Sequence, residues 1–477
     1  MHPLVILLVG IVAIIGLIVV FRVHAFVGLI SAAFVVSLLA TTTPVSATGA
    51  APITLGNAIS TVATEFGNAT GKFGIVIALA SIIGACMMES GAADRIVRAL
   101  LRGLGERRAP VALTASGYIL AIPVFFDTVF YLLVPLARSL YQRTQRRYLL
   151  SIMAIAAGGA ITHTLVPPTP GPLVIAAQLQ IDLGVMIIMG IIVALPAATV
   201  GLLFAAWVDR RMPIPLRDVP GLKTVEPLPD DRLPPLVLSI QPILLPVLLI
   251  SANTAVEAAM KQPCLASQLQ FIQPGLKLLG DPNLALFLAM IIAVGIYRRQ
   301  KRATREQTLE MVEASLLSAG VIILITAAGG AFGAILKAAQ IGPAIEARFA
   351  QLGGSGLGYI LLGFGISLVL KVAQGSSTVA MITTGSMLGA MLTSPAALDC
   401  HPVYLALAIG SGSLVGSWMN DSGFWIFAKM GGLTEVETLR SWTPLLAVLG
   451  CTGLIVTLIL ATLFPLVSAT PSPQSIM

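Results

Sequence analysis

An acidic residue, Asp127, lies among aromatic and aliphatic residues in the segment 125–130. An ionised carboxyl group is costly in apolar surroundings, so an acid in such a place is a functional candidate by default. The surroundings favour its neutral form, which suits reversible binding of a proton. The alternative is a structural ion pair with a buried cation.

Three further titratable residues each allow more than one interpretation. Lys371 either neutralises an anionic solute, pairs with Asp127, or extends its side chain to a membrane interface. Asp421 is expected to cap a helix N-terminus or to take part in proton coupling. His163 titrates near neutral pH and is a candidate to assist proton transfer, although a lone histidine more often has a structural role.

Small polar residues and glycines gather near these titratable groups. Hydroxyl groups bind anions and sugar-like hydroxyls, helix N-termini suit a carboxylate, and glycine lets the backbone approach a ligand. In the other interpretation, these small residues serve close helix packing. The candidate solute-binding residues are Thr162, His163, Thr164, Thr169, Gly171, Lys371, Gly375, Ser376, Ser377, Thr378, Asn420, Ser422 and Gly423.

The elements that must position these residues are membrane helices. The chain has 477 residues, of which 57% are hydrophobic and 10% are charged, whereas a soluble domain has about 25% charged residues. Its mean hydropathy is +0.95, and apolar runs of roughly 20 residues recur, long enough for spanning helices. The net charge of +7 comes from clusters between these runs, which indicates topology and no nucleic-acid partner. The sequence therefore predicts an all-α integral membrane protein.

The basic clusters set the topology, because clusters next to membrane spans face the cytoplasm. The segment 110–137 has such a cluster at both ends, so it is predicted to be a re-entrant hairpin with its tip near 123–127. The segment 149–181 contains several prolines and is predicted to be a broken membrane helix. The clusters lie at 95–108, 138–147, 210–217 and 298–305.

The second half of the chain repeats this order of elements. A first repeat is predicted at 1–208 and a second at 239–477, joined by a proline-rich cytoplasmic linker at 209–238. The second repeat contains a hairpin at 355–395 and a broken helix at 402–429. Each repeat has five spans, an odd number, so the second is inverted relative to the first. The unbroken spans are expected at 3–21, 25–41, 73–92, 184–207, 239–257, 281–297, 313–337 and 442–465.

Weak internal similarity supports the repeat. Three short segments of the first half resemble segments of the second half, and all three pairs share an offset of about 250 residues. The pairs are 89–93 with 339–343, 127–129 with 377–379, and 179–182 with 431–434. Each match alone is near chance, so the shared offset carries the argument.

Four stretches of the sequence resemble motifs of one transporter family. The segment 126–136 resembles a family segment in which an acid precedes an apolar, proline-ended run. The segment 162–172 resembles the family's THxxxPPxPGP stretch, 375–380 its GSxTVA stretch, and 410–425 its GSGS…NDxGFW stretch. Together they are similar to the gluconate permease (gluconate:proton symporter, GntP-type) family of the ion transporter superfamily.

The resemblance implies proton-coupled uptake of gluconate or a related sugar acid or hydroxy acid across a bacterial inner membrane by alternating access. It implies an elevator-type architecture with a scaffold domain and a moving transport domain, commonly as a homodimer, and no cofactor. The organic anion, the proton and the lipid bilayer are then the partners. The solute carboxylate is expected near Ser376, Ser377 and Thr378, with the proton on Asp127 and His163 or Asp421 assisting.

Other functions remain as alternatives. A sodium-coupled carrier of di- or tricarboxylates from the same superfamily is the nearest one. An anion channel fits less well, because channels select with rings of several subunits or loops, whereas this chain has two unequal breaks in inverted halves. An intramembrane enzyme is not expected, because the sequence contains no HExxH and no GxSxG motif.

Overall fold

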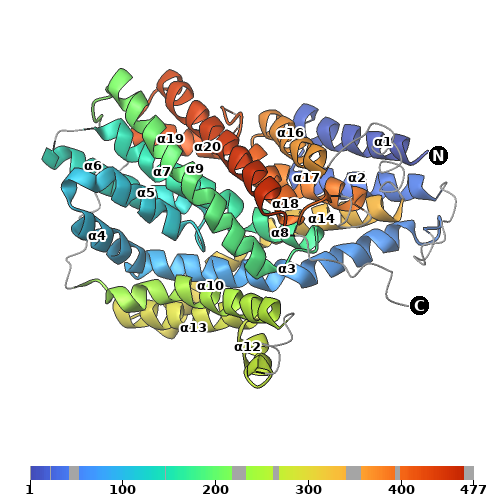
Figure 1. Ribbon diagram of the computed structural model, residues 1–477, viewed down its shortest axis with the longest axis horizontal. Helices are drawn as coiled ribbons and strands as arrows, with labels where there is room; N and C mark the ends of the chain where they lie inside the picture. The colour runs from blue at the N-terminus through green and yellow to red at the C-terminus, as the bar shows by residue number, and fades with distance from the viewer. Residues whose placement is uncertain are drawn as a thin grey trace.

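The computed structural model describes residues 2–21, 23–41, 53–144, 147–217, 232–260, 268–339, 356–392, 398–419 and 421–466. All regular elements in these ranges are helices, so the described chain is all-α. Within these ranges, eight helical stretches are long and apolar enough to cross a membrane (Figure 1), which confirms the predicted integral membrane class. These stretches are Ala58–Glu89, Tyr148–Gln178, Leu183–Arg211, Leu236–Glu257, Pro282–Lys301, Arg305–Ala338, Gly356–Gln374 and Glu435–Leu463.

The N-terminal helices differ in length from the expected spans. Helix α1 (Pro3–Ile15) ends in a single π-helical segment, η1 (Gly16–Val20), and α2 (Ala25–Ala40) follows it. Helix α3 (Ala58–Glu89) is 32 residues long and begins 15 residues before the span expected at 73–92. The helix begins before the apolar run, because the polar side chains of its first half lie on an exposed face. Helix α4 (Ala92–Leu104) and the 3₁₀ turn η2 (Glu106–Arg108) follow.

Two interrupted helical segments lie in the first half of the chain. The first consists of α5 (Ala109–Leu120) and α6 (Phe126–Thr144), and the second of α7 (Tyr148–Leu165) and α8 (Pro170–Gln178). The second break contains a run of prolines, which lack the N–H that a continuous helix needs, and the peptide bond between Pro167 and Pro168 is cis. Helix α9 (Leu183–Arg211) completes this half.

The second half also contains two interrupted segments. Its first four described helices are α10 (Leu236–Ala259), α12 (Gln273–Leu279), α13 (Pro282–Lys301) and α14 (Arg305–Ala338). The interrupted segments are α16 (Gly356–Gln374) with α17 (Ser377–Met391), and α18 (Val403–Gly412) with α19 (Ser422–Gly431), before α20 (Glu435–Leu463). Each break contains a glycine in the left-handed region, Gly375 at φ 83° and Gly416 at φ 81°, where other residues are strained.

The helix starts in the two halves are evenly offset. The N-terminal residues of α6 and α17, Phe126 and Ser377, are 251 positions apart. Helices α8 and α19 begin 252 positions apart, and so do α9 and α20. This spacing agrees with the offset of about 250 residues in the sequence.

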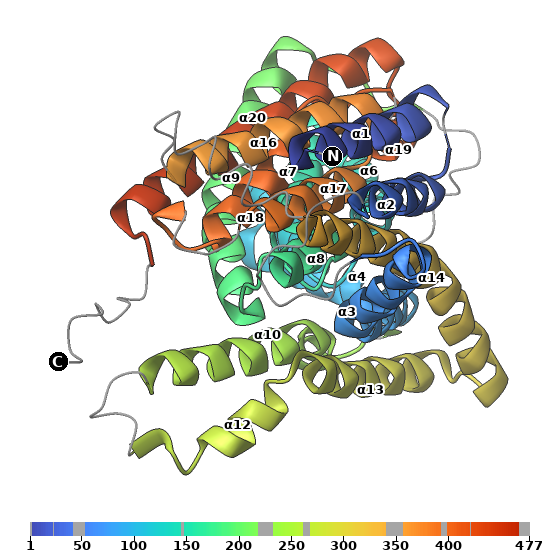
Figure 2. The ribbon, with the colours of Figure 1, turned by 90° about the vertical axis from the view of Figure 1, so that its right-hand side faces the viewer.

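Helices α7 and α18 form the centre of the molecule. Almost every residue of α7 and all ten residues of α18 are buried, and α5, α9, α16 and α20 pack around them. Figure 2 shows α10 and α13 as a pair on the far side of α3 from this central group. The packing is close: a Cβ on Gly158 of α7 would lie 2.0 Å from the carbonyl oxygen of Thr114 in α5.

A polar network joins several helices at the end of the molecule that carries the basic clusters. The guanidinium of Arg217 donates to both carboxylate oxygens of Glu437 at 2.6 and 2.8 Å. The Arg138 side chain donates to the Arg217 carbonyl at 2.7 Å, and the Tyr148 hydroxyl donates to the Gly431 carbonyl at 2.9 Å. The start of the predicted linker is therefore fixed to α6, α7 and α20, whereas residues 218–231 lie outside the described residues.

Candidate solute-binding site

A cavity of about 410 Å³, here called the central cavity, lies where four helices begin. The first turns of α6, α8, α17 and α19 all contribute to its wall, which brings together both hairpin tips and both broken helices. Helix N-termini carry a partial positive charge and free N–H groups, so their convergence suits an anion. The lining residues from these turns are Phe126, Asp127, Thr128, Pro170, Ser377, Thr378, Val379, Ser422 and Gly423.

Local interactions explain why the helices begin there. The Ser376 side chain accepts a hydrogen bond from the Val379 backbone N–H at 3.3 Å and so caps α17. The Asp421 carboxylate accepts one from the Gly423 N–H at 3.0 Å and caps α19. Such caps satisfy N–H groups that have no partner within the helix. Asp421 therefore has the capping role that the sequence offered as one of its two interpretations.

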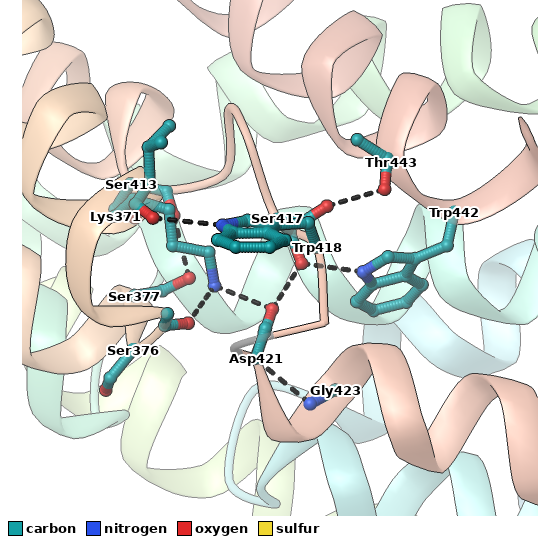
Figure 3. A network of polar contacts seen from close by, with 12 residues as sticks. Lys371, Ser376, Ser377, Ser413, Ser417, Trp418, Asp421, Gly423, Trp442 and Thr443 are labelled. Atoms are coloured by element: carbon teal, nitrogen blue, oxygen red, sulfur yellow. Dashed lines mark hydrogen bonds and ion pairs between the residues drawn. The ribbon is translucent and has the colours of Figure 1, made fainter. Parts of the chain in front are cut away.

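Lys371 of α16 and Asp421, at the start of α19, form a buried ion pair (Figure 3). The Lys371 Nζ lies 2.7 Å from Asp421 Oδ2 and donates to the Gly375 carbonyl at 2.5 Å. The Lys371 side chain is 1% exposed and does not line the central cavity. The expectations that Lys371 pairs with Asp127 or reaches a membrane interface are thus wrong. Its partner is the carboxylate of Asp421, the N-cap of α19, and the sequence alone does not predict this contact.

The same network holds the break between α18 and α19 against the neighbouring helices. The Ser417 hydroxyl donates to Asp421 Oδ2 and accepts from the Trp442 indole N–H at 2.7 Å. The Thr443 hydroxyl donates to the Ser417 carbonyl at 2.6 Å. The Trp418 indole donates to the Val372 carbonyl at 3.0 Å, from the other side of the break. The loop between α18 and α19 is therefore fixed to both α16 and α20.

The Asp127 carboxyl group is unpaired. It lies in the first turn of α6, is partly exposed and lines the central cavity. It forms no hydrogen bond or ion pair with any of the described residues. The hydroxyls of Thr128, Thr378 and Ser422 line the same cavity and likewise have no protein partner within the described ranges. The cavity thus offers a carboxyl group and three hydroxyls to a solute.

His163 and Thr164 complete the wall near the break between α7 and α8. His163 is partly exposed to the cavity, and its Nδ1 has no hydrogen-bond partner among the described residues. Its ring lies edge-on to the ring of Phe125, with centroids 6.0 Å apart. The Thr164 hydroxyl donates to the Ala160 carbonyl of its own helix at 3.1 Å. In the described part of the chain, no three His, Cys, Asp or Glu side chains gather as metal ligands.

Several residues singled out in the sequence do not reach the cavity. Thr162 is fully buried, and the Thr169 hydroxyl donates to the His163 and Val166 carbonyls at 2.9 and 2.7 Å. Gly171 packs against Met381, where an added Cβ would lie 2.1 Å from the methyl carbon. Gly375 accepts the hydrogen bond from Lys371, and Asn420 lies outside the described residues. The sequence candidates that do line the cavity are Asp127, His163, Thr164, Ser376, Ser377, Thr378, Asp421, Ser422 and Gly423.

Part of the wall comes from two helices, α14 and α20, that were not predicted to line a site. Ser318, Ile322 and Ile325 lie on one face of α14, because they are spaced by four and three residues. Trp442 and Leu446 of α20 line the cavity as well. These residues belong to long apolar helices without a break or a charge at these positions, so no local pattern marks them.

Comparison with known proteins identifies the family of the chain. The model of the GntP family permeases matches residues 2–463 of the chain. The chain belongs to the GntP permease family. This GntP permease is therefore a transporter and not an enzyme, as the sequence analysis predicted.

Relatives of this GntP permease match over nearly their whole length. The gluconate permease of Pseudomonas aeruginosa is 32% identical over 474 residues, which cover 96% of this chain and 98% of the relative. The inner membrane permease YgbN of Escherichia coli is 30% identical over 461 residues, covering 94% and 96%. With the eight apolar helices, these matches assign the GntP permease to the bacterial inner membrane as a multi-pass protein.

Two solved transporter structures have a similar fold. The YdaH transporter of Alcanivorax borkumensis aligns with a TM-score of 0.67 at 14% identity, over 93% of this chain and 99% of that one. MtrF of Neisseria gonorrhoeae aligns with a TM-score of 0.62 at 17% identity, over 94% and 95%. At these identities the likeness extends to the fold alone.

Proposed function

We propose that this GntP permease takes up gluconate or a related sugar acid or hydroxy acid, coupled to protons, by alternating access. The observation that carries the proposal is the unpaired Asp127 carboxyl group in a cavity where four helices begin. Relatives named gluconate permease and low-affinity gluconate transporter, 32% and 29% identical, support the solute class. A relative named L-idonate transporter, 28% identical, supports an aldonate more broadly.

The solute carboxylate is expected at the N-termini of α17 and α19. Their first turns present backbone N–H groups together with the hydroxyls of Thr378 and Ser422, whereas the Ser377 hydroxyl donates to the Ser413 carbonyl at 2.8 Å. The remaining hydroxyls around the cavity, at Thr128 and Thr164, suit the hydroxyl groups of a sugar acid. Lys371 contributes indirectly, by holding Asp421 and Gly375 in place.

The balance of charge explains why a proton and an anion would move together. Lys371 and Asp421 neutralise one another, so an ionised Asp127 leaves the site with one negative charge. A second anion beside it would meet repulsion in a poorly screened environment. Protonation of Asp127 removes that repulsion, and the loaded site then carries only the solute's charge. Each of the two is therefore expected to favour the binding of the other.

The two halves of the chain are proposed to be inverted repeats that form the elevator-type architecture. The even offset between the starts of α6 and α17, α8 and α19, and α9 and α20 supports the repeat boundaries 1–208 and 239–477. A homodimer belongs to the same proposal, and the mass of the purified protein in detergent tests it. Inversion is tested by labelling cysteines in the loops after α9 and after α20 from either side of the membrane.

Uptake by purified protein in proteoliposomes tests the function. Radiolabelled gluconate is supplied outside under an inward proton gradient, with and without sodium, and protein-free liposomes serve as the control. Accumulation driven by protons alone is expected. Accumulation that requires sodium would mean that sodium, and not the proton, is the coupling ion. Absence of uptake of gluconate and of a panel of other hydroxy acids would contradict the solute class.

A further inference from the structure

A second cavity, of about 810 Å³ and here called the vestibule, adjoins the central cavity. It lies between the C-terminal end of α3, the end of α13 and the beginning of α14. Its wall includes Glu89 and Lys301, whose charged groups are 3.5 Å apart. Lys301 belongs to the basic cluster 298–305, which the positive-inside rule places in the cytoplasm. The vestibule therefore opens on the cytoplasmic side.

The two cavities share part of their walls. Phe125, Thr128 and Ser318 line both of them, so the vestibule meets the central cavity at this junction. Phe125 and Thr128 flank Asp127 in the first hairpin, whereas Ser318 lies on the opposite wall in α14. Ser318 is exposed, and its hydroxyl has no protein partner among the described residues. The junction thus lies directly beside the unpaired carboxyl group.

One face of α14 runs along the whole path. The residues of α14 that line the two cavities recur at i, i+3, i+4 and i+7, the pattern of one helix face. The face is polar near the vestibule mouth and becomes aliphatic beyond the junction. From the cytoplasmic end inward, its residues are Gln307, Glu310, Met311, Ala314, Ser315, Ser318, Ile322 and Ile325.

We propose that the vestibule is the route between the binding site and the cytoplasm, and that the solute passes Ser318 on this route. The structure is then the cytoplasm-open state of the transporter. Glu310 is exposed in the vestibule and forms no ion pair in the described chain, while Glu89 and Lys301 neutralise one another. The charged residues that line the vestibule thus leave one negative charge uncompensated, which disfavours a resting anion and favours its release.

Thiol labelling tests the route without knowledge of the solute. The native cysteines Cys86, Cys264, Cys400 and Cys451 are replaced by alanine. A cysteine is introduced by Thr378→Cys in the central cavity or, in a separate protein, by Gln307→Cys at the vestibule mouth. A membrane-impermeant thiol reagent is then applied to inverted and to right-side-out vesicles. Thr378→Cys is expected to react several-fold faster in inverted vesicles, which expose the cytoplasmic side.

The decisive step is to obstruct the junction. Adding Ser318→Trp is expected to slow labelling of Thr378→Cys in inverted vesicles while labelling of Gln307→Cys is unchanged. Leu317→Trp is the matched control, because Leu317 is the adjacent residue, is 70% exposed on the outer surface and lines neither cavity. Ser315→Trp provides a second obstruction if the first variant does not fold.

Two results would overturn the proposal. Labelling of Thr378→Cys that is equally fast or faster from the outside would mean that the structure is not open to the cytoplasm. Labelling that Ser318→Trp and Ser315→Trp leave unchanged in inverted vesicles, in folded protein, would mean that the route lies elsewhere. Neither result depends on the identity of the transported anion, so this proposal and the proposed function fail separately.

Discussion

The ammonium group of Lys371 lies 2.7 Å from the carboxylate of Asp421, and both side chains are buried. The pair joins the tip of the second hairpin to the break between α18 and α19, since Lys371 also binds the Gly375 carbonyl. A cation satisfied in this way is not free to bind a solute carboxylate. We therefore expect Lys371 to affect transport by positioning the two helix N-termini that face the central cavity.

The ion pair predicts a rescue experiment. Lys371→Met leaves Asp421 as an unpaired buried charge, an effect of about 3–5 kcal/mol for buried pairs, so uptake and thermal stability should both fall. The double variant Lys371→Met/Asp421→Asn should recover much of both, because an asparagine oxygen can still accept from the Gly423 N–H. The measurement is initial uptake across solute concentrations together with thermal unfolding in detergent.

A different outcome would separate positioning from direct binding. If Lys371 contacted the solute, the double variant would transport no better than Lys371→Met, and its KM would stay high although its stability returned. Lys371→Arg, which keeps the charge, is the control for the loss of the ammonium group. The recovery of KM, and not of stability alone, is therefore the informative quantity.

Asp127→Asn should uncouple transport. The amide mimics the neutral acid, so the solute is expected to bind and to exchange across the membrane, while proton-driven accumulation is lost. The measurement compares exchange of labelled for unlabelled gluconate with accumulation under an inward proton gradient. Asp127→Glu, which retains a carboxyl group, is the control. Accumulation against a gradient by the asparagine variant would refute the assignment of the proton to Asp127.

Thr378→Val should weaken solute binding without harming the fold. The Thr378 hydroxyl lines the central cavity and has no protein partner in the described ranges. A hydrogen bond to a charged group contributes about 1.5–3 kcal/mol, so KM should rise at least about tenfold. Thr378→Ser should remain close to the wild type. Thr383→Val, at a buried position of α17 outside the cavity, should leave KM unchanged; an equal rise there would mean a general defect of the helix.

Gly158→Ala should destabilise the central helices. The added Cβ would lie 2.0 Å from the Thr114 carbonyl oxygen and 2.8 Å from the Tyr118 backbone nitrogen. Both are backbone atoms, so α5 and α7 must move apart, and overpacking of this kind costs about 1–3 kcal/mol. Thermal unfolding of purified protein measures the effect. Gly295→Ala, with no atom within 4 Å of the added Cβ, is the control, and equal melting temperatures would contradict the packing argument.

The helix breaks were predictable because their causes are local. Prolines at 167–172 remove N–H donors, and the loops at Gly375 and Gly416 each contain a glycine with positive φ. The described breaks at 121–125, 166–169, 375–376 and 413–421 all fall within the segments in which a hairpin or a broken helix is predicted from the sequence. The hydroxyls and acids at these breaks could be named for the same reason, since helices that begin there present them inward.

The remaining features depend on contacts between distant parts of the chain. The partner of Lys371 is 50 residues away in Asp421, and neither local charge pattern nor periodicity distinguishes it from Asp127. Ser318, Ile322 and Ile325 lie in a helix of 34 residues whose sequence is apolar on several sides. Their role follows only from the packing of α14 against the hairpins, which is a property of the assembled fold.

The two hairpin tips have corresponding positions but different chemistry. The second residue of α6 is Asp127, an acid without a partner in the described part of the chain. The second residue of α17 is Thr378, a neutral hydroxyl close to the Lys371–Asp421 ion pair. In the proposed mechanism, the proton therefore binds in the first half of the chain, whereas the solute carboxylate binds at a helix start in the second half. A substitution at Thr378 is then expected to change solute binding while the proton-binding carboxyl group stays the same, and a substitution at Asp127 to change proton coupling while the start of α17 stays the same.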